Sequence, residues 1–404
     1  MRPWLVPYPK FGDGPGLERV SAMARRLGVD LAAFGQSGAV IVGSNGKGST
    51  AAMTAALLRQ RGRSVGLFTS PHLFDLNERF NIDGEDISDE ALEHHWGRVG
   101  AAVDEEGLSA KIGGFEFLFL IAADWFAARA CVHTTWEAGI GGRLDPVSLI
   151  AAQRLALTAL DLEHTQILGD TLEEIARDKI GAAPRGARLY APESIPVRDA
   201  IVAHCAELGL GLTFVAPLDD APLPGAHQRA NAALALAVAR DIAPVSDAQV
   251  RAGFASTRWP GRLEIIEETP LVVIDVGHTP DAVRVALEGF SAMRGARRGV
   301  LVCGVSQDKK AADLITLLAP AFDTIICASA AHKGAPTAEI AALAAAANPG
   351  AELTIAESVA DARHLALAKA KSAETAVYVA GGLFLAAEFR AVHMGGDPAS
   401  LAFF

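Results

Sequence analysis

The chain has 404 residues, of which 50% are hydrophobic and 21% are charged, and its formal net charge is −11. This composition is typical of a globular protein, and the length exceeds what one hydrophobic core usually supports, so we expect two domains. The charge balance argues against nucleic acid or a membrane surface as a partner, because such partners select clustered Lys and Arg and the chain has no strong basic block.

The cysteines and the apolar segments bear on cellular location. We interpret the cysteines as reduced core residues, not as a disulfide framework or a zinc site, because they are scattered and lie mostly in apolar runs: Cys131, Cys205, Cys303 and Cys327. Residues 1–7 are too short and too broken by proline for a signal peptide. The most apolar segment, 115–130, contains Glu116, Asp124 and Arg129 and is too short to span a bilayer. We therefore expect a soluble, cytoplasmic protein.

The first part of the chain alternates helical patterns with short apolar runs. Helices are predicted over residues 16–27, 51–60, 115–130, 171–179, 228–240 and 246–255, and another begins at Ser88. Strands are predicted over residues 39–42, 64–68, 131–136 and 155–160, followed by a helix–strand unit over 196–215. Thr171 and Glu174 form a predicted capping box, and residues 77–84 form a polar loop or hairpin.

The segment Trp259-Pro260-Gly261-Arg262 is the expected hinge. After it, strands are predicted over residues 271–275, 299–304, 324–328, 353–355 and 376–380, alternating with helices over 280–293, 308–318, 337–347, 358–371 and 383–390. Such alternation favours an α/β fold with a mainly parallel sheet that helices cover on both faces.

A glycine-rich loop joins the strand 39–42 to the helix 51–60: Gly43-Ser44-Asn45-Gly46-Lys47-Gly48-Ser49-Thr50. Backbone N–H groups in such a loop can surround phosphate oxygens at the positive end of the helix. Lys47 adds a mobile positive charge, and Ser49 or Thr50 adds a hydroxyl for phosphate or magnesium. The strict GxxxxGK[ST] spacing fails, because Gly48 follows the lysine and no glycine stands five positions before Gly46. The loop predicts nucleotide binding, and an ordinary glycine turn is the alternative.

Polar residues follow three of the predicted strands, where ligands gather in open α/β sheets: Ser70, Glu137 and His164. A hydroxyl, a carboxylate and an imidazole can together hold a magnesium ion against nucleotide phosphates. Singly they are equally well explained as a turn residue, a surface charge and a loop histidine. The segment from Gly139 to Gly142 lacks the GxGxxG spacing of a dinucleotide site. Lys179, taken alone, is an ordinary lysine at a helix end.

Together these motifs resemble the dihydrofolate synthase/folylpolyglutamate synthase family of the Mur-ligase superfamily. The family's order is matched, over nearly the whole chain, by residues 43–49, 69–72, 77–79, 137–145, 164–169, 227–232, 259–264, 275–280 and 308–309. The resemblance implies an N-terminal P-loop ATPase-like Mur-ligase domain over residues 1–257. It also implies a smaller Rossmann-like C-terminal α/β domain, the glutamate-ligase domain, over residues 258–404.

The resemblance also implies an activity, that of an ATP- and Mg²⁺-dependent amide ligase. ATP phosphorylates a carboxylate of a pteroate- or folate-like substrate, and the amine of L-glutamate attacks the acyl phosphate. Catalytic roles are implied for Lys47, His164, Lys179 and His278, with Lys47, Arg262 and magnesium neutralising charge on the transferred phosphoryl group.

Two binding sets follow from the same resemblance. The nucleotide-binding residues are Asn45, Gly46, Lys47, Gly48, Ser49, Thr50, Asn231, Arg262 and Asp275. The metal-binding residues are Ser70, Glu137, His164 and Lys179. Lys179 matches the lysine that becomes carbamylated in the family, and it needs that modification because an unmodified ammonium cannot bind a cation.

The chain departs from the family pattern at three places. The usual Asp-Gly-Ala-His-Asn-Pro is here Asp275-Val276-Gly277-His278-Thr279-Pro280, and the usual Gly-Ser-Leu is Gly381-Gly382-Leu383. The aspartate that usually precedes the metal histidine is Glu163. The serine replaced by Gly382 is linked with amino-acid binding in the family, so the departures concern the acceptor side of the site.

The leading hypothesis is a ligase that joins L-glutamate to dihydropteroate, extended to further glutamates on folates. A second hypothesis, motivated by Thr279 and Gly382, is a paralogue that joins another carboxylate to another amine. A third is a non-catalytic nucleotide-binding or interaction protein, against which Lys47, Glu137, His164 and Lys179 argue. The oligomeric state does not follow from the sequence, and the working expectation is a monomer.

Overall fold

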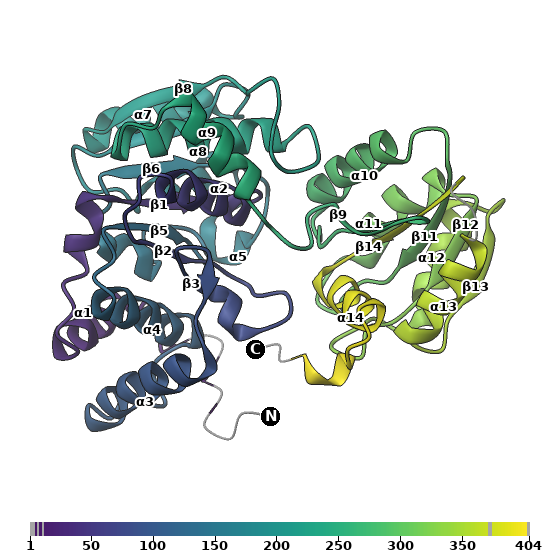
Figure 1. Ribbon diagram of the computed structural model, residues 1–404, viewed down its shortest axis with the longest axis horizontal. Coiled ribbons are helices and arrows are strands. Elements are labelled where there is room, and N and C mark those ends of the chain that lie inside the picture. Colours follow the sequence, from purple (N-terminus) through teal and green to yellow (C-terminus); the bar gives the residue numbers. More distant parts are fainter. Residues whose placement is uncertain (1–4, 6–7, 10–11, 371–373, 402–404) are drawn as a thin grey trace.

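The computed structural model of the protein describes residues 5, 8–9, 12–370 and 374–401. Most of the amino-terminal stretch 1–7 therefore lies outside the described residues, as does Lys371 at the expected end of the helix 358–371. Two separate sheets organise the chain, and Figure 1 shows them in two lobes that are joined by the segment running from α9 (Asp247–Ser256) to β9 (Glu264–Glu268). The predicted domain boundary at 257/258 falls in this segment and stays a prediction.

The first lobe contains an eight-stranded sheet of order β4-β3-β2-β5-β1-β6-β7-β8. Its strands are β1 (Gly38–Val42), β2 (Val65–Phe68), β3 (Phe80–Ile82), β4 (Glu85–Asp86), β5 (His133–Glu137), β6 (Arg154–Leu157), β7 (Arg188–Pro192) and β8 (Gly211–Val215). At one edge β3 pairs antiparallel with both β2 and β4, and the other pairings are parallel. The ends of β2, β5, β1 and β6 therefore meet at one edge of the sheet.

Helices cover both faces of this sheet. They are α1 (Leu17–Arg26), α2 (Lys47–Arg59), α3 (Asp89–Glu105), α4 (Gly114–Ala128), α5 (Thr165–Leu168), α6 (Leu172–Ile180), α7 (Arg198–Leu208), α8 (Gln228–Ile242) and α9. Alternate residues of β1 point to opposite faces. Val40 and Val42 belong to the core beneath α1, α3 and α4, whereas Ala39 and Ile41 pack with α2 and α8. Because β1 is buried on both faces, the core fixes the point at which the phosphate loop begins.

The second lobe contains a six-stranded sheet of order β13-β12-β11-β14-β10-β9. Its other strands are β10 (Leu271–Ile274), β11 (Arg298–Cys303), β12 (Thr324–Cys327), β13 (Glu352–Ile355) and β14 (Thr375–Ala380). Helices α10 (Pro280–Arg294), α11 (Ala311–Leu318) and α12 (Thr337–Ala347) cover one face, and α13 (Val359–Lys369) and α14 (Leu383–His393) cover the other. The expected mainly parallel, doubly covered sheet is confirmed, and among its strands in the described residues only β9 runs antiparallel.

The structure differs from the sequence-based assignment at a few elements. Strands β7 and β9 were not predicted; β7 ends in a proline, and β9 is rich in glutamate at a sheet edge. The strand expected over 155–160 ends at Leu157, because the Thr158 hydroxyl turns to bond the Val42 and Asn45 carbonyls at 3.2 and 2.7 Å. The predicted capping box of Thr171 and Glu174 is confirmed. No helix within the described residues has the length and apolarity needed to cross a membrane.

Candidate active site

The phosphate loop is anchored on the residues that follow β6. The Ser44 backbone N–H donates to the Ala159 carbonyl at 2.7 Å, and the Ser44 hydroxyl donates to the Asp161 carbonyl at 3.2 Å. Lys47, the first residue of α2, folds back so that its Nζ donates to the carbonyls of Gly43 and Ser44 at 2.9 and 3.1 Å. The ammonium group therefore lies at the loop, where phosphate oxygens would be bound.

Gly48 breaks the strict nucleotide motif, and the structure provides a reason. A Cβ at this position would lie 2.4 Å from Cζ2 of Trp259 and 3.3 Å from Oε2 of Glu137. Trp259 belongs to the expected hinge, so the loop helix and the segment between the lobes touch at a point with no room for a side chain.

We expect Gly48→Ala to lower the free energy of unfolding by about 1–3 kcal/mol, because the added methyl forces Trp259 to move. Urea denaturation measures this change. The matched control is Gly97→Ala, also within a helix, where no atom lies within 4 Å of the new Cβ and the substitution should be neutral or stabilising. Equal stability of the two variants would contradict the packing argument.

Glu137 and Ser70 meet at the ends of two paired strands. Glu137 is the last residue of β5 and is 4% exposed, and its Oε2 accepts a hydrogen bond from the Ser70 N–H at 2.8 Å. Burial raises the pKa of Glu137, while Lys47, the Ser70 N–H, Arg262 and Arg79 oppose that rise. A buried carboxylate surrounded by cations from both lobes is a suitable oxygen donor for a divalent metal.

Lys179 and Glu163 form an ion pair next to the phosphate loop. Lys179, in α6, is 1% exposed and donates to the Gly43 carbonyl at 2.9 Å and to Glu163 Oε1 at 3.2 Å. Burial and the nearby Lys47 lower the pKa of Lys179 to about 8. Burial opposes ionisation of Glu163, but Lys47, Lys179 and His164 outweigh it and lower the pKa of that carboxyl. The two lysines thus share one carbonyl of the loop.

His164 is held at the entrance to α5 in an unusual backbone conformation. Its φ is 48°, in the left-handed region that non-glycine residues adopt only when their surroundings impose it. Burial lowers the pKa of His164; Glu163 opposes this effect, and Lys309, Lys47 and Lys179 add to it. The resulting neutral imidazole is the form that binds metal ions.

Helix α8 presents Asn231 and Gln228 to the phosphate loop. The Asn231 amide donates to Gln228 Oε1 at 2.9 Å, and the Gln228 amide donates to the Ser49 hydroxyl at 3.3 Å. A Cβ at Gly46 would lie 2.6 Å from Asn231 Oδ1, so the two residues are in contact range. The fully buried Thr50 hydroxyl has no hydrogen-bond partner within the described part of the chain. Gln228 is not among the predicted site residues, although it lies in the segment 227–232 that matches the family.

The second lobe contributes Asp275, His278 and Arg262. Asp275 is buried, and its two carboxylate oxygens accept hydrogen bonds from the N–H groups of Gly277 and Leu263 at 2.7 and 3.0 Å. It therefore shapes the turn that carries Arg262, and its role as a nucleotide contact stays a prediction. Burial, Lys309 and Arg262 lower the pKa of His278 to about 4.

Two of the three departures from the family pattern, Thr279 and Gly382, lie beside hydrogen-bonding groups of other segments. The Thr279 hydroxyl accepts a hydrogen bond from the Ala282 N–H at 3.3 Å, capping α10, and is 3.4 Å from the Asn45 amide nitrogen, which donates to it. This contact joins the phosphate loop directly to the second lobe. A Cβ at Gly382 would lie 3.6 Å from the Ser306 hydroxyl, so a hydroxyl is present beside the position where the family's serine is missing.

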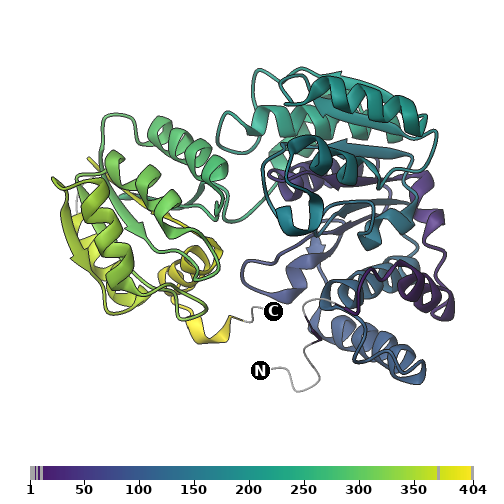
Figure 2. The ribbon, with the colours of Figure 1, turned by 180° about the vertical axis from the view of Figure 1, so that it is seen from behind.

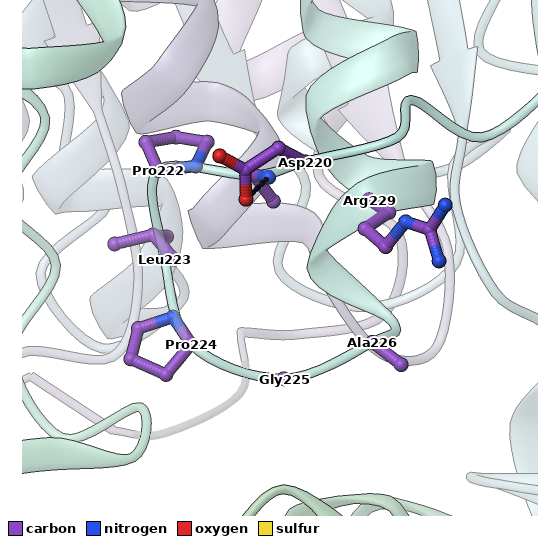
Figure 3. A pocket seen from close by; sticks show the side chains of 8 residues that line it. Asp220, Pro222, Leu223, Pro224, Gly225, Ala226 and Arg229 are labelled. Atoms are coloured by element: carbon purple, nitrogen blue, oxygen red, sulfur yellow. Dashed lines mark hydrogen bonds between the residues drawn. The ribbon is translucent and has the colours of Figure 1, made fainter. Parts of the chain in front are cut away.

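One hollow of about 400 Å³ lies outside this cluster, on the loop between β8 and α8. It is lined by loop residues 220–226, which include two prolines, and by Arg229. Figure 3 shows the Arg229 guanidinium directed away from Pro222 and Pro224, and its Nε donates to the Leu218 carbonyl at 2.6 Å. None of the predicted site residues lines this hollow, so we place the site at the strand ends.

The predicted magnesium set combines a serine and a lysine with Glu137 and His164. Within the described ranges, no three or more His, Cys, Asp or Glu residues form a group that could hold a metal ion. A metal at this edge would therefore depend on the Ser70 hydroxyl, the modified Lys179, phosphate oxygens and water for its other ligands. The Glu137 carboxylate, which is buried and accepts a hydrogen bond from the Ser70 N–H, and the neutral His164 imidazole are suitable ligands for such a metal ion.

Comparisons with known proteins point to one family. The family described as Mur ligase, glutamate ligase domain, matches residues 261–383. A probable bifunctional folylpolyglutamate synthase/dihydropteroate synthase of Halobacterium salinarum is 32% identical over 415 residues, covering 96% of this chain and 50% of the relative. The chain thus spans about half of that relative's length. The dihydrofolate synthase/folylpolyglutamate synthase of Bacillus subtilis is 31% identical, covering 78% of this chain and 81% of the relative.

A solved structure gives the same result for the fold. The bifunctional folylpolyglutamate synthase/dihydrofolate synthase of Yersinia pestis, complexed with AMPPNP and a manganese ion, superimposes with a TM-score of 0.82 at 28% identity. The superposition covers 97% of this chain and 95% of the other. The expected two-domain Mur-ligase architecture is confirmed.

Proposed function

The chain belongs to the dihydrofolate synthase/folylpolyglutamate synthase family, and on that premise we propose that it is an ATP-dependent ligase that joins L-glutamate to dihydropteroate. In the proposed reaction a carboxylate oxygen attacks the γ-phosphorus of ATP, and ADP leaves. The glutamate amine then attacks the acyl phosphate carbon, and the tetrahedral intermediate expels phosphate as the amide forms and the amine loses a proton.

One observation carries this proposal: cations from both lobes act on one buried carboxylate. Lys47 of the first lobe and Arg262 of the second both oppose the rise in the pKa of Glu137. The 3.4 Å contact between Asn45 and Thr279 brings the phosphate loop against the second lobe. Phosphoryl transfer depends on such convergent positive charge, because its transition state spreads negative charge over the phosphoryl oxygens.

We propose that Ser70, Glu137, His164 and carbamylated Lys179 hold Mg²⁺ during turnover. When bound, the ion would polarise the phosphoryl oxygens and neutralise their charge. Lys179 fits the modification, because its amine is buried beside the phosphate loop with a pKa lowered to about 8. Enzyme equilibrated with ¹³C-bicarbonate should show a carbamate carbon signal by NMR that is absent from Lys179→Met. A signal of equal size in that variant would contradict this assignment.

The function is tested with purified protein, ATP, dihydropteroate and L-glutamate. We expect equal amounts of ADP, phosphate and the glutamyl amide, the amide identified by mass spectrometry. Reduced folates in place of dihydropteroate test whether further glutamates are added. Nucleotide binding without amide formation from any of these acceptors would refute the folate assignment.

A second candidate is a paralogous ligase with a different amine or carboxylate. It is favoured by Gly382, where the family's serine is missing, although the Ser306 hydroxyl lies next to that position. A panel of amino acids offered with each carboxylate distinguishes the two candidates by which pair forms an amide. We further propose that the enzyme is a cytoplasmic monomer, which light scattering of the purified protein and cell fractionation test.

A further inference from the structure

The loop between β2 and the short helix η2 (Leu76–Arg79), here called loop 70–75, leaves the first lobe and packs on the second. Figures 1 and 2, seen from opposite sides, both show the segment before β3 reaching toward α14. Leu73 is 6% exposed and belongs to the apolar cluster of β10 and α14, and Phe74 packs against the same cluster. The first lobe thus inserts Leu73 into the core of the second and packs Phe74 against that core.

Phe74 lies against Arg390 of α14. The Arg390 Cζ is 4.2 Å from the centroid of the Phe74 ring, a cation–π contact. The Arg390 Nε donates to Glu264 Oε1 at 2.8 Å, and Glu264 Oε2 accepts a hydrogen bond from the Gly261 N–H at 2.8 Å. The chain of contacts from Phe74 therefore ends at the residue immediately before Arg262.

Leu73 touches the same turn directly. Gly261 has a φ of 72°, and a Cβ there would lie 2.8 Å from Leu73 Cδ2 and 2.8 Å from Val276 Cγ1. The Gly261 carbonyl accepts a hydrogen bond from the Val276 N–H at 2.9 Å. The turn that carries Arg262 is therefore enclosed between β10 and loop 70–75.

The other end of loop 70–75 is tied to the buried carboxylate of the site. The Ser70 N–H donates to Glu137 Oε2 at 2.8 Å. Glu78 accepts hydrogen bonds from the N–H groups of residues 73, 74 and 75 at 2.7, 2.9 and 2.9 Å, so the loop is internally fixed. The backbone that connects Phe74 to Ser70 is therefore short, and its part from residue 73 onward is held by Glu78.

We propose that Phe74 and Arg390 form a latch between the lobes that positions Arg262 relative to Ser70 and Glu137. Phe74 and Arg390 are positioning residues, since the structure connects them to the site only through other side chains and the backbone. The catalytic consequence rests on the proposed ligase function, whereas the mechanical connection does not. Opening the latch leaves the phosphate loop intact but releases the cation that the second lobe contributes.

The kinetic test is a double-mutant cycle with Phe74→Leu and Arg390→Met. Each single variant should lower kcat about 10- to 100-fold, because small misplacements of a catalytic cation are costly. The double variant should be no slower than the slower single variant, because both substitutions remove the same contact. The KM for ATP should stay within about twofold of wild type. Phe74→Tyr should retain wild-type kcat because it keeps the aromatic ring. The matched control is Arg284→Met, which removes a half-exposed guanidinium bonded to Asp281 and Glu288.

The mechanical test needs no substrate. Hydrogen exchange measured by mass spectrometry should show faster exchange in peptides spanning loop 70–75 in Arg390→Met but not in Arg284→Met, although residue 390 lies in the other lobe. If loop 70–75 exchanges faster in Arg390→Met but the wild-type protein forms no amide, the latch is supported and the proposed function is rejected. Unchanged hydrogen exchange of loop 70–75 in Arg390→Met would overturn the latch. So would a double variant whose loss in kcat equals the product of the two single losses. Neither outcome affects the ligase assignment.

Discussion

Lys47→Ala is expected to lower the rate of ADP formation with both substrates present about 10²- to 10³-fold, with the fold retained. Within the described part of the chain, the Lys47 ammonium donates only to carbonyls of its own loop, at 2.9 and 3.1 Å, so its removal breaks no hydrogen bond between elements of the core there. It does remove the positive charge that acts on both Glu137 and Glu163 and that, in the proposed reaction, faces the transferred phosphoryl group. A coupled assay for ADP measures the loss.

Two variants define how the Lys47 result is interpreted. Lys47→Arg keeps the charge on a bulkier group and should retain more activity than Lys47→Ala. Lys111→Ala removes an exposed lysine that is remote from the loop in sequence and should leave the rate unchanged. If Lys47→Ala turned over as fast as Lys111→Ala, the loop would be an ordinary glycine turn and the catalytic assignment would be wrong.

Glu137→Gln is expected to reduce ligation by a similar factor, about 10²- to 10³-fold, for a different reason. Glutamine keeps the size of the side chain and can still accept the Ser70 N–H, but it lacks the negative charge that a divalent cation requires. Burial raises the pKa of Glu137, which means that its ionised form is disfavoured in the folded state. The neutral substitution should therefore lower the free energy of unfolding by no more than about 1 kcal/mol.

The control for Glu137→Gln is Glu388→Gln. Glu388 is also a buried carboxylate that accepts backbone hydrogen bonds, from Ala331 and His332 at 2.9 and 3.0 Å, but it has no predicted role in the site. We expect Glu388→Gln to retain activity and Glu137→Gln to lose both activity and Mn²⁺ binding measured by electron paramagnetic resonance. Retained Mn²⁺ binding in Glu137→Gln would remove Glu137 from the metal set.

Much of the fold could be predicted because its signals are local. The run Ala39–Val42 is apolar and mostly β-branched, the loop after it is rich in glycine, and Thr171 with Glu174 forms a capping box. Each of these elements can therefore be predicted from a few neighbouring residues. Strand β9 escaped prediction because three of its five residues are glutamates, which an edge strand tolerates when one side faces solvent. Its place depends on pairing with β10, which no local pattern encodes.

The sequence by itself determined the alternation of strands and helices, the phosphate loop and the set of motifs that resembles one ligase family. Only the tertiary structure decided that Lys179 bonds the Gly43 carbonyl, that Gly48 leaves room for Trp259, and that Phe74 lies against Arg390. These pairs are far apart in the chain, and their meeting follows from the strand order β2-β5-β1-β6 and from the packing of two lobes. Hydrophobic periodicity and helix caps depend on residues close together in the sequence. The active site depends instead on which strand ends become neighbours in the folded sheet.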